Sequence, residues 1–125
     1  MVFKNAILSL LIGMSVVFMS SCTKDEPSVL KVFVRSSANI LTPGAHVRIV
    51  GDVNKDTPEF MAEKKTNESG VAIFELDELF DQYGKKEDKI AYFTVYARDT
   101  AEFPTLGKAR AKQYLTSTET IILED

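Results

Sequence analysis

Apolar and polar side chains alternate one by one along several short stretches of this chain. In residues 29–35 every second side chain from Leu30 to Val34 is apolar, and Lys31 and Arg35 fall on the other face. A period of two is that of an extended strand with one buried face, whereas a helix repeats about every 3.6 residues. The alternation therefore predicts a sheet that covers a core and disfavours a helical bundle.

Turn residues separate the stretches that we predict to be strands. Pro43 with Gly44, and residues 67–70, are turn sequences, because Pro fixes one backbone dihedral angle and Gly accepts a positive one. Residues 77–83 predict a single helical turn, and the charges within 60–66 place that strand at a sheet edge. The pattern predicts an all-β fold, a two-layer antiparallel sandwich. The predicted strands are residues 29–35, 45–50, 60–66, 71–76, 90–98, 106–115 and 119–124.

Two segments resemble a known family. They are PGAHV at residues 43–47 and TNESGVAIF at residues 66–74. They are similar to the carboxypeptidase-regulatory-like, or prealbumin-like, domains, whose signature is a PGA-x-V strand followed by T-[ND]-x-x-G-x-A-x-F. The resemblance implies a seven-stranded antiparallel, Ig-like or prealbumin-like β-sandwich over residues 29–125. It also implies an accessory module of surface or secreted proteins, which is seldom a catalyst.

The first 21 residues have the pattern of a secretion signal. Lys4 is the only charged residue before Lys24, an apolar run occupies residues 6–19, and the small Ser20 and Ser21 follow it. This order is typical of a cleaved signal peptide, and the apolar run is shorter than the ~20 residues that span a bilayer. We therefore predict a signal helix at residues 1–21 that is removed from the mature chain.

The only cysteine of the chain, Cys22, directly follows the two serines. The segment Met19-Ser20-Ser21-Cys22 resembles the lipobox of bacterial lipoproteins. The resemblance implies cleavage before Cys22, acylation of its sulfur and amino group, and a lipid anchor in the outer membrane, with residues 22–28 as a tether. The alternative is a signal peptide cut at a nearby site, which would leave a free thiol.

The residues after Cys22 are Thr23-Lys24-Asp25-Glu26-Pro27. They are similar to the export tag of Bacteroidota surface lipoproteins, in which one lysine precedes two acids. The resemblance implies that Lys24, Asp25 and Glu26 direct the chain to the cell surface. The alternative is a plain polar tether, because charged segments that contain Pro are common linkers.

Composition limits the range of functions. Loss of residues 1–21 removes Lys4 and leaves 104 of the 125 residues, with a formal charge of −4 instead of −3. An acidic chain of this kind argues against a nucleic-acid partner. His46 is the only histidine, so neither a catalytic triad nor a zinc site can be built around it from a second histidine or a cysteine nucleophile. We expect no catalytic residues, no metal and no cofactor.

Aromatic and basic side chains alternate with apolar ones on two consecutive predicted strands, which are expected to pair. One outward face could stack a sugar ring or hold an anionic glycan. The alternative is ordinary packing between tyrosines and lysines on neighbouring strands. The residues of this candidate ligand face are Tyr92, Tyr96, Lys108, Arg110, Lys112 and Tyr114.

Asp99-Thr100-Ala101 resembles the O-glycosylation site of Bacteroidota secreted proteins, which implies a sugar on Thr100. A match of only three residues also occurs by chance.

The sequence as a whole predicts a lipid-anchored binding or scaffolding module of the cell envelope, without catalytic activity, whose ligand is a glycan or a protein. The alternative is an accessory subunit of an outer-membrane polysaccharide-uptake or adhesion assembly.

Overall fold

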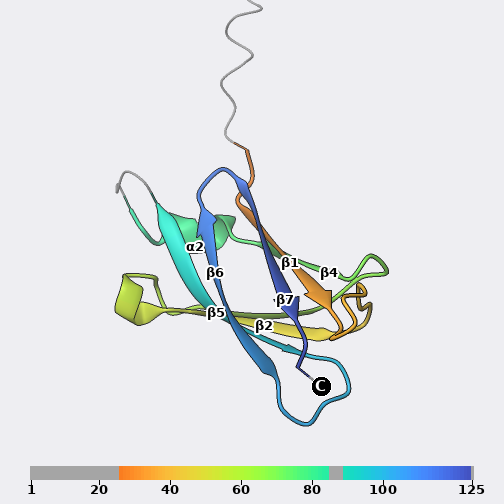
Figure 1. Cartoon of the computed structure of the whole chain (residues 1–125). Coiled ribbons are helices and arrows are strands. Elements are labelled where there is room, and N and C mark those ends of the chain that lie inside the picture. The colour runs from red at the N-terminus through yellow and green to blue at the C-terminus, as the bar shows by residue number, and fades with distance from the viewer. Residues whose placement is uncertain (1–25, 85–88, 125) are drawn as a thin grey trace, which may run out of the picture.

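The structure is a computed structural model, and it describes residues 26–84 and 89–124. The described chain is mostly β and forms two sheets (Figure 1). Sheet A has three strands in the order β4-β1-β7, and sheet B has four in the order β3-β2-β5-β6. The strands are β1 (Val29–Arg35), β2 (His46–Gly51), β3 (Met61–Lys65), β4 (Val71–Glu75), β5 (Ile90–Arg98), β6 (Thr105–Lys112) and β7 (Thr116–Ile122).

The prediction of an all-β chain is confirmed, and two strands have the predicted bounds. They are β1 and β5, in which buried and partly exposed side chains alternate as the sequence pattern requires. The edge position predicted for β3 is confirmed by the strand order of sheet B. A helical turn, α2 (Asp77–Asp81), follows β4 as predicted, and its Leu79 and Phe80 are fully buried. A short 3-10 helix, η2 (Val53–Lys55), joins β2 to β3.

The prediction that all strands pair antiparallel is wrong for sheet A. The last strand, β7, lies parallel to β1, with partners that run from Val29 and Thr116 to Arg35 and Ile122. The reason is that β6 belongs to sheet B, and a tight turn brings the chain across to sheet A at the end where β1 begins. Sheet A is therefore mixed, with β4 antiparallel and β7 parallel to the central β1.

The strands predicted at 106–115 and 119–124 have other bounds. β6 ends at Lys112, and β7 already begins at Thr116. Between them Tyr114 has a φ of 63°, in the left-handed region that breaks an extended strand. Its amide donates a hydrogen bond of 2.8 Å to Oγ of Ser28, instead of joining a strand ladder.

The core contains apolar side chains from both sheets. Phe74 of β4 and Phe93 of β5 are among its largest members, and Phe60 packs against Phe93 edge to face, with ring centres 6.2 Å apart. Buried side chains of α2 join the same cluster, so the helical turn extends the core beyond the strands. The strand residues of this cluster are Leu30, Val32, Val34, Val47, Ile49, Ala72, Phe74, Ala91, Phe93, Val95, Ala97, Ala109, Ala111 and Ile121.

The turn before β4 is held by side-chain hydrogen bonds. The buried hydroxyl of Thr66 accepts a hydrogen bond from the Ala45 amide at 2.8 Å and donates one to the Thr42 carbonyl at 2.7 Å. Oδ1 of Asn67 accepts from the amide of Ser69 in the turn and from that of Val71 at the start of β4. Gly70 has a φ of 74°, as the turn sequence predicts. The residues that carry the family resemblance therefore have physical roles in this turn.

Several predictions concern residues outside the described ranges. They are the signal peptide at 1–21, the lipidated Cys22, and Lys24 and Asp25 of the export tag. Glu26 is the first described residue, and it is exposed. Within the described ranges, no helix has the length and apolar character needed to cross a membrane.

Candidate ligand face of sheet B

The tyrosines and basic residues of the candidate face share the outer surface of sheet B. On β5, Tyr92 and Tyr96 alternate with buried side chains and are half-exposed. The neighbouring β6 places Arg110 directly opposite Tyr92. Lys108 and Lys112 lie on the same face, two residues to either side of Arg110, and all three side chains are exposed.

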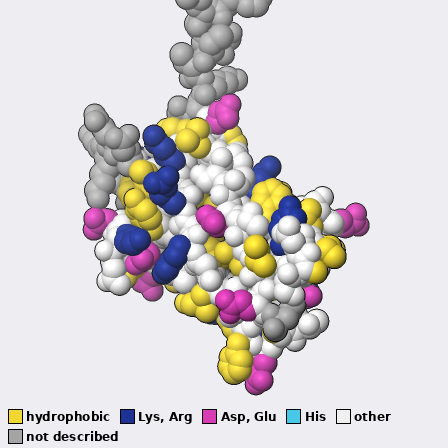
Figure 2. Space-filling view, viewed as in Figure 1, with side chains coloured by type: hydrophobic (Ala, Val, Ile, Leu, Met, Phe, Trp, Pro, Cys, Tyr) yellow, Lys and Arg dark blue, Asp and Glu magenta, His cyan; other side chains and the backbone are white. Residues whose placement is uncertain are grey.

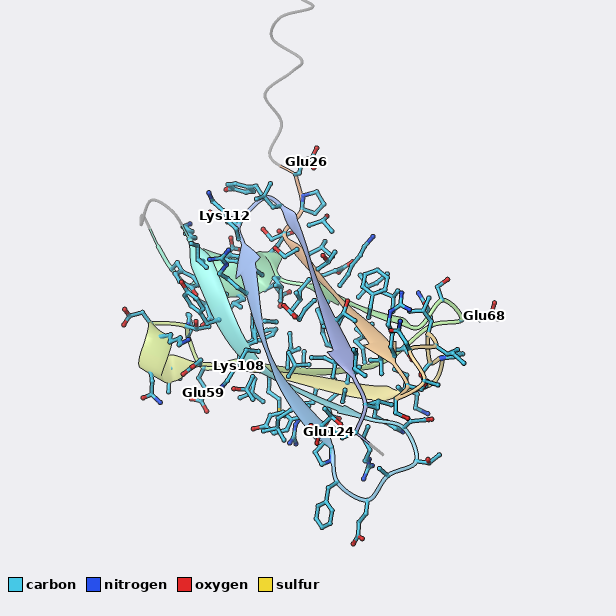
Figure 3. The ribbon with its side chains drawn as sticks, viewed as in Figure 1. Glu26, Glu59, Glu68, Lys108, Lys112 and Glu124 are labelled. Carbon is cyan, nitrogen blue, oxygen red and sulfur yellow. The ribbon has the colours of Figure 1, made fainter. Side chains whose placement is uncertain are left out.

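Figure 2 shows dark blue side chains gathered in a column on the left of the view, over the edge of sheet B. Figure 3 places Lys112 at the end of the molecule where the chain enters, and Lys108 further along β6. Lys108 is not entirely free, because its Nζ donates a hydrogen bond of 3.0 Å to Oγ1 of Thr94 on β5. The basic column therefore follows the outer edge strand of the sheet.

Tyr114 does not belong to this face, so its inclusion was wrong. It lies in the turn after β6, with Gln113 and Leu115, and not on the strand. Tyr114 would share a face with Arg110 and Lys112 only if the strand ran without a break from residue 106 to residue 115. The side chain of Tyr114 is 44% exposed at the end of the molecule where the described chain begins.

The strand on the other side of β5 adds a basic residue that the sequence did not assign to the face. Arg48 of β2 lies opposite Tyr96, and its guanidinium carbon is 4.7 Å from the centre of the tyrosine ring. This is the distance of a cation–π contact. Nε of Arg48 is buried and has no hydrogen-bond partner among the described residues.

A hollow of about 510 Å³ opens beside this stacked pair. Most of its ionisable lining is basic, and Glu63 of β3 is the one carboxylate among the lining residues. The strand register explains the grouping, because His46 of β2 lies between Lys65 of β3 and Arg98 of β5. The lining residues are His46, Val47, Arg48, Glu63, Lys64, Lys65, Tyr96, Arg98 and Pro104.

A second cation lies over the other tyrosine. Nζ of Lys55, which comes from η2, is 5.3 Å from the centre of the Tyr92 ring. Both tyrosines therefore already have one ring face in contact with a cation. Chemically, the surface offers several N–H donors and positive charge, a combination that binds carboxylate, sulfate or phosphate oxygens.

Sequence reasoning missed five lysine and arginine residues around this surface as ligand candidates: Arg48, Lys55, Lys64, Lys65 and Arg98. The alternation on 45–50 does place His46 and Arg48 outward. The missing step was the pairing of β2 with β5, which are not consecutive strands. A rule that pairs neighbours in sequence finds β5 with β6 but cannot find β2 with β5.

Thr100, the candidate glycosylation site, lies in the bend after β5, where it is exposed. Its modification stays a prediction. Over residues 26–84 and 89–124, no group of three or more His, Cys, Asp or Glu side chains is placed to hold a metal ion.

No protein-family model matches the chain, and no curated protein gives a significant match.

Proposed function

We propose that the chain is a lipid-anchored, non-catalytic binding module of a bacterial cell envelope, and that it holds an acidic glycan on the outer face of sheet B. The choice of an acidic glycan as the ligand depends on one observation. Nε of Arg48 is buried without a hydrogen-bond partner in the described chain, beside a basic hollow. An unsatisfied buried donor costs about 1–3 kcal/mol, and that cost is removed when the guanidinium turns so that Nε meets an acceptor oxygen of a ligand in the hollow.

The distribution of charge supports an acidic rather than a neutral sugar. The chain has a formal charge of −3, yet the hollow is lined mainly by basic side chains, with Arg48 and Arg98 among them. A guanidinium group binds a carboxylate or sulfate through two parallel hydrogen bonds. The rings of Tyr92 and Tyr96 are each engaged by a cation on one face. Charge therefore discriminates between ligands more strongly here than ring stacking does.

The N-terminal residues support the cellular part of the proposal. The segment 19–22 resembles a lipobox, and Lys24, Asp25 and Glu26 resemble a surface-export tag. We place the chain at the outer membrane, anchored through an acylated Cys22 and facing outward. For the fold, the two sheets and their common core are compatible with a prealbumin-like sandwich in which β7 joins sheet A in parallel.

The second candidate is an accessory subunit of an uptake or adhesion assembly. Such a subunit could accept a strand of its partner at an exposed sheet edge. The β3 edge carries Glu63, Lys64 and Lys65, and charged side chains on an edge oppose the addition of a strand. The binding of a glycan therefore has more support than strand exchange at this edge.

The ligand is tested with three oligosaccharides of equal length: oligogalacturonate, a sulfated galactose oligomer and a neutral galactose oligomer. We expect calorimetry to detect binding of the acidic oligomers only, and to detect none with a Tyr96→Ala/Arg48→Ala variant. Lys31→Ala, on the outer face of sheet A, is the control and should bind normally. Failure to bind either acidic oligomer, or equal binding of the neutral one, would reject the acidic-glycan ligand.

The anchor is tested separately in cells fed an alkyne analogue of palmitate. The wild-type chain should become labelled, and Cys22→Ala should not. Equal labelling of the two chains would show that the acyl groups are not on Cys22.

A further inference from the structure

The turn between β6 and β7, residues 113–115, lies directly beside the N-terminal end of the described chain. The Tyr114 amide donates to Oγ of Ser28, and the Val29 amide donates to the Leu115 carbonyl at 3.0 Å. Figure 3 shows Glu26 and Lys112 at this same end of the molecule. The position of the turn relative to the tether is thus fixed by hydrogen bonds to residues 28 and 29.

This turn exposes two large side chains on a fixed backbone. Tyr114 is 44% exposed and Leu115 is 50% exposed. A third hydrogen bond, from the Gln113 amide to the Lys89 carbonyl at 3.0 Å, holds the start of the turn. Tyrosine favours the membrane–water interface because its ring is apolar and its hydroxyl is polar. The adjacent Lys112 is exposed and adds a positive charge, which anionic lipid head groups attract.

The length of the tether limits how far this end can lie from a bilayer. Residues 23–25 separate Cys22 from Glu26, so about 14 Å of fully extended chain is the most that can join their Cα atoms. If Cys22 carries acyl chains in the membrane, as the proposed function holds, the end of the molecule with Glu26 stays at the lipid surface. The turn at 113–115 shares that end.

The two sides of this end differ in charge. One side has an open acidic hollow, whose lining includes Glu26, Asp77 and Asp81. Carboxylates are repelled by anionic lipid, so this side is the less favourable one to press against the membrane. Tyr114 and Gln113 also line this hollow, whereas Leu115 and Lys112 are exposed and are not among its lining residues.

The opposite end of the molecule offers a built-in comparison. Phe103 is 77% exposed in the loop between β5 and β6, which Figure 1 shows at the end away from the N-terminal chain. The register of β5 and β6 runs from Ala97 with Thr105 at that end to Ile90 with Lys112 at the tether end. At about 3.3 Å per residue, more than roughly 20 Å separates the two ends.

We infer that the β6–β7 turn is a membrane contact, with Tyr114 and Leu115 in the head-group region of the bilayer that holds the acyl chains of Cys22. The domain contacts the membrane with this end. The basic hollow lies at the opposite end of sheet B, near His46, and is directed away from the lipid. This inference rests on the lipid anchor of the proposed function but not on its glycan ligand.

The chain contains no tryptophan, so a single introduced one reports its own surroundings. Two variants of the acylated full-length protein are purified from membranes: Tyr114→Trp and, for comparison, Phe103→Trp. Each is reconstituted into vesicles of phosphatidylglycerol and phosphatidylcholine, the latter brominated near the top of its acyl chains. We expect the fluorescence of Tyr114→Trp to shift to the blue and to lose roughly half of its intensity, because bromine quenches tryptophan at the interface. Phe103→Trp should show neither change.

The outcomes separate the membrane contact from the anchor. Mass spectrometry of the same samples shows whether Cys22 is acylated. An acylated protein whose two tryptophans respond alike overturns the membrane contact and leaves the anchor intact. A protein without acyl groups on Cys22 overturns both. A Leu115→Trp chain provides a second reporter in the turn, and it should respond as Tyr114→Trp does.

Discussion

Arg48 on β2 and Tyr96 on β5 lie opposite each other in an antiparallel pair, with the guanidinium carbon 4.7 Å from the ring centre. A planar guanidinium can stack on a ring and still direct N–H groups sideways, whereas an ammonium group cannot do both. The pair therefore fixes the direction in which Arg48 presents its donors to the hollow.

Replacement of Arg48 by lysine keeps the charge but removes the planar donor group. We expect Arg48→Lys to weaken the binding of oligogalacturonate by about tenfold or more, because a charge-assisted hydrogen bond contributes about 1.5–3 kcal/mol. Calorimetric titration measures the change. The control is Arg35→Lys, since Arg35 belongs to sheet A and donates to the Asn39 carbonyl. An equal loss of affinity in the two variants would mean that Arg48 has no special role.

Substitutions at two glycines with the same φ angle distinguish the cost of backbone strain from the cost of a steric clash. Gly44 and Gly70 both have a φ of 74°, but only at Gly70 would a Cβ atom meet neighbours, at 2.9 Å from Cβ of Leu41 and 3.0 Å from the Thr42 amide nitrogen. We expect Gly44→Ala to lower the free energy of unfolding by about 1–2 kcal/mol, the cost of a left-handed alanine. Gly70→Ala should cost more, about 2–4 kcal/mol, because backbone must also move. Denaturant titration compares them, and equal losses would contradict the predicted conflict.

The buried hydroxyl of Thr66 joins two backbone groups, the Ala45 amide and the Thr42 carbonyl. Thr66→Val keeps the shape of the side chain but leaves both groups without this partner. We expect a loss of about 2–4 kcal/mol in the free energy of unfolding. Thr66→Ser retains the hydroxyl and should recover most of that loss. If valine and serine destabilise the chain equally, packing and not hydrogen bonding explains the role of Thr66.

Tyr83 should make the stability depend on pH in the alkaline range. Burial raises the pKa of its hydroxyl above the ordinary value of 10.0, nearby Tyr92 and Asp56 add to the rise, and the Thr57 hydroxyl opposes it. The unfolded chain therefore releases this proton at a lower pH than the folded chain does. The contribution of Tyr83 is complete below pH 10 and declines as the pH rises through its folded pKa.

The comparison with Tyr83→Phe isolates this effect from the other tyrosines. At neutral pH the variant should be less stable by about 0.5–1.5 kcal/mol, because the hydroxyl donates to the Ile90 carbonyl at 3.0 Å. Above pH 10 the difference between the two chains should narrow. Urea titrations at pH 7 to 11 measure it, and a difference that grows with pH would contradict the direction of the pKa shift.

The sequence was most informative where the local pattern and the tertiary structure agree. Leu30, Val32 and Val34 occupy every second position of β1 and are fully buried. The turn residues Asn67 and Gly70 also behave as their chemistry predicts. In each case the physical cause lies within a few residues of the chain, so no knowledge of distant partners is needed.

The errors arose from contacts between distant segments. Nothing near β1 indicates that β7 will lie parallel to it, and nothing near Arg48 indicates that Tyr96 will be its neighbour. Tyr114 adopts a left-handed conformation that its residue type does not favour, and its amide is bonded to Ser28, far away in sequence. The alternation on β5 and β6 predicted which of their side chains share the outer face of sheet B, but not that the surface extends across β2.

The parallel pairing of β1 with β7 joins the first and the last strand of the domain. Because β1 is the middle strand of sheet A, that sheet is incomplete until residue 122 is free to pair. A polypeptide that emerges amino end first from a ribosome therefore cannot complete sheet A until residues 116–122 have emerged. Contacts so distant in sequence also form slowly. The topology thus makes the completion of sheet A a late step in folding.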